Sequence, residues 1–320
     1  MDMKKLIPVA YTKKILGRNS ANNAIHSSIL FCHASGFNKE IMTPIINELS
    51  NTLDIQKKSV NGIFFDFTGH GDSRDRIHNF NENLLWSDFL PEDIHEVMSK
   101  NVGNTNEKQL RIGVGHSMGA AGLVMAELKY PNMFDGLILY EPILFPPTPP
   151  GVNANTSPTS LAANALKRRY QWESYESAKQ ALENRGIFPA MDTRAFLGYI
   201  YGGMFENKND NCVELKCSPQ VESKMFDQPH VSIWNELKYI KCKTLVMCGS
   251  DSTHMQGYEI YKDTPELFQD MSTYFTNSTF QAMLNTGHFG PLERPVEFSN
   301  IILDFINEVK PENNQHSSKL

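Results

Sequence analysis

The sequence predicts an α/β fold, a mostly parallel twisted sheet flanked by helices, with an inserted helical cap. Two observations predict it. Short apolar runs rich in β-branched and aromatic residues alternate along the chain with segments of helical periodicity. One long polar segment of helical periodicity then interrupts this alternation. Alternating strands and helices are typical of a parallel sheet covered by helices on its faces.

The predicted elements follow from these patterns. The runs predicted as strands are residues 29–33, 62–66, 110–115, 136–140, 244–249 and 279–284. The segments predicted as helices, with apolar residues three or four positions apart, are residues 39–49, 91–100, 120–129 and 297–309.

The insertion begins at a proline-rich run, residues 145–151, and continues as polar helical sequence to about residue 239. A connection of this length is too long for a simple loop, so we expect a mostly helical cap with the proline run as a semi-rigid hinge. The predicted organisation is a core of residues 1–144 and 241–312, a cap of residues 145–240, and a polar tail of residues 313–320.

Charge, hydropathy and short motifs indicate which classes of partner the protein has. The net charge of −6 argues against nucleic acid, and no apolar stretch is long enough to cross a bilayer. The five cysteines are scattered without metal-site spacing, which favours reduced thiols and no metal. The last three residues, Ser318, Lys319 and Leu320, match the tripeptide that the peroxisomal import receptor recognises, so we expect this receptor as a partner and the peroxisomal matrix as the location.

The strongest functional signal is the pentapeptide Gly-His-Ser-Met-Gly at residues 115–119, which an apolar run enters and a helix-forming run leaves. This context predicts a sharp strand-to-helix turn, a nucleophile elbow, with Ser117 at its apex. Gly115 and Gly119 lack the bulk that would keep strand and helix apart around a serine at positive φ. Ser117 is therefore the candidate nucleophile.

A serine hydroxyl needs a base to take its proton, and His288 has the best context among the histidines. It follows the last predicted strand in a loop bracketed by glycines, which can direct the ring to the carboxyl edge of the sheet. Two carboxylates compete to orient it, Glu141 at the end of strand 136–140 and Asp251 after strand 244–249. We favour Glu141, because a glutamate between an apolar strand and a proline run needs a partner more than a loop aspartate does.

An oxyanion intermediate also needs donors, and backbone N–H groups are already fixed in place. The N–H of Met118, at the start of the helix after the nucleophile, is one predicted donor. The second is expected from the loop of residues 33–37, from Ser35 with Ala34 as the near alternative.

These segments occur in the order typical of the α/β-hydrolase superfamily, which the chain resembles apart from the cap and the two ends. The resemblance is carried by His-Ala-Ser-Gly-Phe at residues 33–37, Asp-Phe-Thr-Gly-His-Gly-Asp-Ser at 66–73, the elbow, and Gly-His-Phe-Gly-Pro-Leu-Glu at 287–293. The strand end Leu-Tyr-Glu-Pro-Ile at 139–143 and the terminal tripeptide make the chain similar, more narrowly, to peroxisomal lipases of this superfamily.

By that resemblance Ser117 is the nucleophile and His288 the base, while Glu141 matches a glutamate at the equivalent strand end in such a lipase and in haloalkane dehalogenases. The chain departs from the superfamily pattern at two positions, in the oxyanion loop and at the alternative acid. Ala34 stands where the oxyanion loop usually has glycine, and Asp251 lies one residue earlier than the usual acid. A serine nucleophile in place of an aspartate argues against dehalogenase or epoxide hydrolase chemistry.

The expected function is that of a serine hydrolase that cleaves carboxylic esters, in particular small-molecule acyl esters of the lipid class, without a metal or organic cofactor. One alternative is a peroxisomal acyl-CoA thioesterase, whose CoA phosphates the basic cluster Lys167, Arg168 and Arg169 could receive. The other is a non-catalytic binding protein of the same fold.

Overall fold

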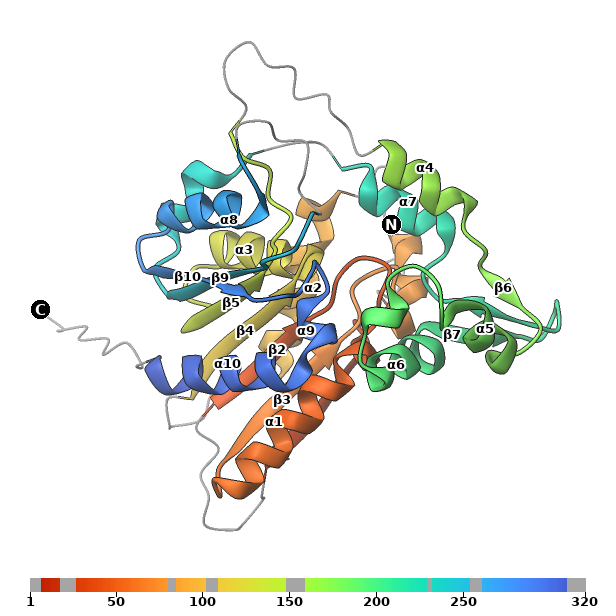
Figure 1. The fold of residues 1–320 in the computed structure, drawn as a ribbon, viewed down its shortest axis with the longest axis horizontal. Coiled ribbons are helices and arrows are strands. Elements are labelled where there is room, and N and C mark those ends of the chain that lie inside the picture. Colours follow the sequence, from red (N-terminus) through yellow and green to blue (C-terminus); the bar gives the residue numbers. More distant parts are fainter. Residues whose placement is uncertain are drawn as a thin grey trace, which may run out of the picture.

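The computed structural model describes residues 7–17, 27–79, 85–101, 109–147, 159–228, 232–253 and 261–309. At its centre lies a seven-stranded sheet of order β1-β3-β2-β4-β5-β9-β10 (Figure 1). Neighbouring strands from β3 to β10 are parallel, and β1 pairs antiparallel with β3. The strands are β1 (Tyr11–Gly17), β2 (Ser27–Cys32), β3 (Ser59–Phe65), β4 (Leu110–His116), β5 (Gly136–Tyr140), β9 (Lys243–Gly249) and β10 (Ser278–Met283).

Helices cover both faces of this sheet, so the predicted α/β class is confirmed. On one face lie α1 (Thr43–Ile55) and α10 (Pro295–Glu308), and on the other lie α2 (Trp86–Asn101), α3 (Met118–Lys129) and α8 (Thr264–Thr273). Strand β2 shows how the sheet separates the two cores. Its Ile29 and Phe31 pack against the first set of helices, and Leu30 and Cys32 against the second.

Two predicted helices have different bounds for local reasons, and one strand of the sheet was not predicted. Residues 39–42 form a 3-10 turn, η1 (Lys39–Met42), because Pro44 starts the true helix α1 in its first turn. Helix α2 begins before Pro91 and contains it. Strand β1 was not predicted, because at the sheet edge most of its side chains are exposed and the apolar signal is weak.

Between β5 and β9 the chain leaves the large sheet. The longest described stretch of this insertion, residues 159–228, is called the inserted segment below. It forms four α-helices, one 3-10 helix and a three-stranded antiparallel sheet of order β6-β8-β7 that was not predicted. Its elements are α4 (Thr159–Lys167), β6 (Gln171–Trp172), α5 (Tyr175–Leu182), η3 (Phe188–Ala190), α6 (Thr193–Gly203), β7 (Met204–Asn207), β8 (Cys212–Leu215) and α7 (Pro219–Phe226).

The remaining short helices are η2 (Gly71–Asn79), η4 (Trp234–Tyr239) and α9 (Gly290–Glu293). Among the described residues, none of the helices combines the length and the apolar character that a membrane span requires.

The inserted segment rests on the loop that follows β2, as its position beside α1 and β2 in Figure 1 indicates. Helix α6 crosses η1 at Gly198, where a Cβ would lie 2.3 Å from the backbone oxygen of Glu40, so only glycine permits this approach. A second contact is electrostatic. Lys216, between β8 and α7, donates to Asp72 at 2.6 Å. The segment is therefore fixed over the carboxyl edge of β2 and β3.

A buried ammonium ties the loops after β2 and β3 together. Lys39 Nζ lies 2.7 Å from Asp66 and 2.6 Å from Asp72, and the Lys39 backbone N–H donates to the other oxygen of Asp66 at 2.7 Å. Burial alone would lower the pKa of the Lys39 ammonium, but the two carboxylates raise the pKa well above its ordinary value. The ion pair therefore stays charged at physiological pH and fixes the start of η1.

Two buried histidines complete this support. His33 donates from Nδ1 to the Ala34 carbonyl at 2.8 Å and accepts from the Phe67 N–H at 3.2 Å, while His70 accepts from the Gly36 N–H at 3.0 Å. Each ring acts as an acceptor at Nε2, which requires the neutral form. Burial lowers the pKa of His33 to about 4 and that of His70 to about 3.

We expect these histidines to make the fold sensitive to acid. Because their folded pKa values lie below the ordinary value of about 6.5, only the unfolded chain takes up their protons as the pH falls from about 6.5 towards 4. Each should lower the free energy of unfolding by about 1.4 kcal/mol per pH unit in this interval. In His70→Asn this slope should be smaller by about that amount, measured by urea unfolding between about pH 4.5 and 6.

The control is His95→Asn, which removes an exposed histidine of α2. A slope in His70→Asn equal to that of the parent protein would show that His70 is not held neutral by the fold.

Candidate active site

Ser117 occupies the turn between β4 and α3. Its backbone has φ 57° and ψ −117°, a conformation that non-glycine residues rarely adopt and that is found at strained functional turns. The Ser117 N–H donates to the Tyr140 carbonyl at 2.9 Å, which ties the turn to the end of β5. The side chain lies just beneath the surface, with 7% of the residue exposed.

A side chain at either glycine of the elbow would overlap backbone atoms of a neighbouring segment. A Cβ on Gly115 would lie 2.6 Å from Ala120 Cα in the helix, and a Cβ on Gly119 would lie 2.3 Å from the carbonyl oxygen of Cys32. Gly115 thus permits the strand and helix to approach, whereas Gly119 permits the helix to approach the end of β2. The start of α3 therefore lies directly against the loop of residues 33–37.

Glu141 follows β5 and pairs with His288. The distance from Glu141 Oε2 to His288 Nδ1 is 2.5 Å, and the carboxylate is fully buried. Two further donors hold it, the Gly249 N–H on Oε1 and the Ser252 hydroxyl on Oε2, each at 2.9 Å. Glu141 itself has a φ of 44°, a second strained position in this small region.

The loop that carries His288 is fixed by the strands beside it. His116 donates from Nε2 to the His288 carbonyl at 2.8 Å, and the Tyr140 hydroxyl donates to the Gly287 carbonyl at the same distance. Because Ser117 directly follows His116, whose ring donates to the His288 carbonyl, the Ser117 turn lies near the Glu141–His288 pair at the carboxyl ends of β4 and β5.

The environment of His288 suits a base. Burial lowers the pKa of its imidazole, so the ring is neutral at physiological pH and able to accept a proton, and the Glu141 carboxylate on Nδ1 stabilises the imidazolium that then forms. With Nδ1 directed to a carboxylate, the proton lies on that nitrogen, and Nε2 is the nitrogen suited to accept another.

Asp251, the alternative acid, lies elsewhere. It follows β9 as expected, but its side chain is exposed and accepts from the Ser250 hydroxyl at 2.7 Å, while its backbone N–H donates to the Thr286 carbonyl. Strands β5 and β9 are neighbours on the same side of β4, as predicted, so sheet order alone does not separate the two acids. The direction of the side chains does separate them: the Glu141 carboxylate contacts His288, whereas the Asp251 carboxylate contacts Ser250.

The candidate oxyanion donors also lie close together. Met118 is the first residue of α3, where helix N–H groups are left without partners within the helix. Ser35 and Ala34 lie in the loop that packs against this helix start. The Ser35 hydroxyl is buried and makes no hydrogen bond within the described part of the chain.

Four groups that hold Glu141 or the His288 loop in place were not predicted from the sequence: the Gly249 N–H, the Ser252 hydroxyl, the His116 ring and the Tyr140 hydroxyl. Only His116 and Tyr140 stand inside motifs that were singled out, and neither carries a signal for the bond it makes. Ser252 directly follows the rejected acid, so its role depends on how the turn after β9 is folded.

The basic cluster proposed for CoA phosphates is only partly available. Arg168 is engaged inside the inserted segment, donating to Glu222 at 2.6 Å and to the Tyr199 hydroxyl. Arg169 donates to the Gln171 carbonyl at 2.8 Å. No cluster of three His, Cys, Asp or Glu side chains suited to a metal ion occurs among the residues that the structure describes.

The chain is similar to proteins of known family and structure. The alpha/beta hydrolase family matches residues 29–301 of the chain. The Abhydrolase domain-containing protein ACTT2-1 of Alternaria alternata is 26% identical over 224 residues, covering 62% of this chain and 83% of that protein.

Two solved structures share the fold at lower identity. The peroxisomal alpha-beta-hydrolase Lpx1 of Saccharomyces cerevisiae is 16% identical with a TM-score of 0.74, covering 98% of this chain and 93% of its own. A thermophilic esterase from Thermogutta terrifontis, also 16% identical, has a TM-score of 0.59 and 95% coverage of both chains. The family match spans the elbow, the Glu141–His288 pair and the loop after β2, and the chain therefore belongs to the alpha/beta hydrolase family.

Proposed function

We propose that this protein is a serine hydrolase that cleaves carboxylic esters, with Ser117, His288 and Glu141 as its catalytic triad. The observation that carries the proposal is the hydrogen bond between His288 and the buried Glu141, beside a serine held in a strained turn. A nucleophile, a base and a group that orients the base are the parts that acyl transfer requires.

The reaction would proceed in two halves. His288 Nε2 takes the Ser117 proton as the serine oxygen attacks the ester carbonyl, and the imidazolium then gives that proton to the leaving alcohol. This leaves an acyl group on Ser117. Water attacks the acyl group, His288 takes one water proton, and the carboxylic acid leaves as the proton returns to Ser117.

The other residues would stabilise charge. Glu141 holds the His288 ring and offsets the positive charge that forms on it, while the Gly249 N–H and the Ser252 hydroxyl hold the carboxylate in place. The Met118 N–H and a group of the 33–37 loop, Ser35 first and Ala34 second, would bind the oxyanion.

Acyl lipids are the proposed substrate class, with acyl-CoA thioesters as the alternative. The same triad would serve both, but Arg168 is bound to Glu222 and so is not available to receive phosphate without breaking that pair. This favours the ester over the thioester.

Replacement of the nucleophile tests the proposal. We expect Ser117→Ala to lose at least about 1,000-fold in kcat for chromogenic acyl esters, because no acyl-enzyme can form. The rates should be measured on esters of several chain lengths and, in parallel, on a matching acyl-CoA. Unchanged turnover in Ser117→Ala would contradict the proposal, and faster turnover of the acyl-CoA would favour the thioesterase.

A fluorophosphonate probe separates a catalyst from a non-catalytic binding protein of this fold. The parent protein should become labelled at Ser117, and the alanine variant should not. A folded parent protein that resists labelling would favour the binding protein.

The two candidate acids can be compared directly. Glu141→Gln should lower kcat by roughly 1,000-fold or more, because an amide oxygen no longer stabilises the imidazolium and the ring loses its tautomer. Asp251→Asn should stay within a few-fold of the parent protein, because Asp251 is exposed and bonded to Ser250. The measurement is kcat on a chromogenic ester, with circular dichroism as the folding control, and the reverse order would assign the acid to Asp251.

We also propose a peroxisomal location. Ser318, Lys319 and Leu320 lie outside the described residues, so the proposal depends on their sequence. A fluorescent protein fused to the N-terminus should give a punctate peroxisomal signal, and deletion of the tripeptide should make the signal diffuse. The same puncta after deletion would show that import does not use these residues.

A further inference from the structure

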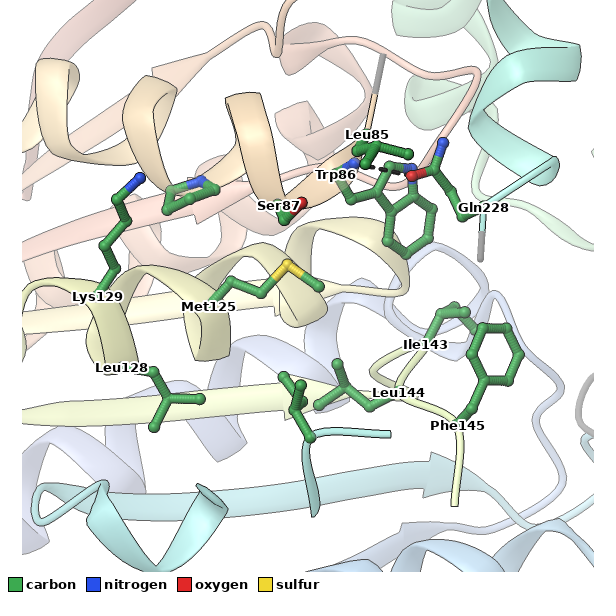
Figure 2. A pocket seen from close by; sticks show the side chains of 12 residues that line it. Leu85, Trp86, Ser87, Met125, Leu128, Lys129, Ile143, Leu144, Phe145 and Gln228 are labelled. Atoms are coloured by element: carbon green, nitrogen blue, oxygen red, sulfur yellow. Dashed lines mark hydrogen bonds between the residues drawn. The ribbon is translucent and has the colours of Figure 1, made fainter. Parts of the chain in front are cut away.

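The two faces of the sheet carry different side chains next to the site. On the face of α2 and α3, a groove of about 480 Å³ with mostly apolar walls lies between these helices and the loop after β5 (Figure 2). On the face of α1 and α10, aromatic side chains gather beside His288 instead. Phe289, the next residue along the chain, packs against the core on this face but is only partly buried. Its ring therefore lies at the border between the core and the site.

The Phe289 ring contacts an aromatic ring from each of three elements of the site. Its centroid lies 5.0 Å from that of His288 at an interplanar angle of 78°, and 5.8 Å from that of His116 at 86°. The Phe37 ring, from the loop after β2, also lies 5.8 Å away, at 67°. Aromatic rings prefer such edge-to-face contacts, with centroids roughly 4.5–7 Å apart. One side chain thus joins the loop of the base, the elbow and the oxyanion loop.

Phe37 gives this arrangement a fixed support. Its side chain is buried, and its backbone N–H donates to the Ala34 carbonyl at 3.3 Å. Tyr199 of α6 packs edge-on against it, with the centroids 5.9 Å apart and the rings at 85°. Tyr199 is itself buried and accepts a hydrogen bond from Arg168. The inserted segment therefore supports Phe37, and Phe37 supports Phe289.

The backbone of the loop that carries the base is held without the Phe289 side chain. The Gly287 carbonyl accepts from the Tyr140 hydroxyl at 2.8 Å. The Phe289 carbonyl accepts from the Leu292 N–H at 2.7 Å, at the start of α9. A change of the Phe289 side chain should therefore leave this loop in place and act on the neighbouring rings.

The imidazole of His288 needs a constraint on its tilt. The hydrogen bond from Nδ1 to Glu141 fixes the position of one ring atom, and by itself it does not fix the plane of the ring. A catalytic group must lie within about 0.5 Å and roughly 10–20° of its productive geometry. A misplacement of about 1 Å can cost roughly 100-fold in rate. An edge-on neighbour such as Phe289 restricts the tilt that the hydrogen bond leaves open.

We propose that Phe289 is a positioning residue for the base: its ring, supported by Phe37, sets the tilt of the His288 imidazole so that Nε2 faces Ser117. The inference rests on the proposed function for the reaction that the base performs. It adds a role for a side chain outside the triad and the oxyanion loop. Phe289 acts through His288 and exchanges no proton itself.

Replacement of the ring tests this role. Phe289→Leu keeps an apolar side chain, and kcat on a chromogenic ester should fall about 10- to 100-fold while KM changes less than about threefold, because substrate still binds beside a misplaced base. Phe289→Tyr restores the ring and should stay within about twofold of the parent protein. The matched control is Phe280→Leu, which removes a partly buried phenylalanine from β10 and should leave kcat unchanged.

A second measurement needs no turnover. In protein with ¹³C-labelled histidine, the Cε1–H NMR signal of His288 is identified by its loss in His288→Asn. This signal should broaden or split in Phe289→Leu, because the ring then samples several tilts, and it should stay as sharp as the parent's in Phe289→Tyr and Phe280→Leu. Near-UV circular dichroism checks folding, and Phe289→Met provides the same test if the leucine variant does not fold.

The two proposals fail in different ways. If the parent protein hydrolyses no ester, the proposed function fails, while the His288 signal still tests the role of Phe289. If that signal in Phe289→Leu is as sharp as the parent's, Phe289 does not set the tilt of the ring. A loss of kcat that Phe289→Tyr fails to restore would also contradict the proposal, because the aromatic ring would then not be the feature that matters.

Discussion

The buried carboxylate of Glu141 is the constraint on which the arrangement of the site depends. An ionised carboxylate with no exposed surface is costly unless its oxygens are hydrogen bonded. Here the donors come from three separate places, the end of β9, the turn after it, and the loop that carries His288. Satisfying one group therefore fixes three segments relative to β5, and the position of His288 follows from that requirement.

The loop after β2 is held by one buried cation and two neutral histidines. Lys39 is stabilised as a cation by Asp66 and Asp72, while His33 and His70 are kept neutral by burial and by the backbone groups they contact. The charge of Lys39 is thus paired with carboxylates, and the two rings carry none. The preorganised backbone of this loop is the property that oxyanion binding requires, because donors that are already fixed need not reorganise during reaction.

The sequence predicted the parts of this protein that depend on local pattern. The elbow is encoded by small residues around Ser117, where a side chain would overlap backbone, and the central strands by continuous apolar runs. The choice of Glu141 over Asp251 followed from the cost of burying a carboxylate, and the structure has Glu141 buried and Asp251 exposed. The burial of Glu141 could be predicted because it depends on a single residue and its immediate surroundings.

Features that depend on distant partners were not predicted. The strands of the inserted segment are two to four residues long and pair only with one another, so no periodicity identifies them. Likewise Ser252 and the Gly249 N–H acquire their roles only when β9 lies beside β5. The groove is the clearest case, because α2, α3 and the loop after β5 each contribute apolar residues that a sequence reading assigns to the core.

The loops after β2 and β3 both border the candidate site and contact the inserted segment. Gly198 brings α6 onto the backbone of η1, and Asp72 joins Lys39 in the core to Lys216 in the segment. The loop that carries Ser35 is thus part of the foundation of the segment above it. Displacing the segment on this side would break the ion pair between Lys216 and Asp72 and separate Gly198 from the backbone of Glu40. On the other side of the site, the loop after β5 carries Ile143, Leu144 and Phe145, which line the groove and follow Glu141 in sequence.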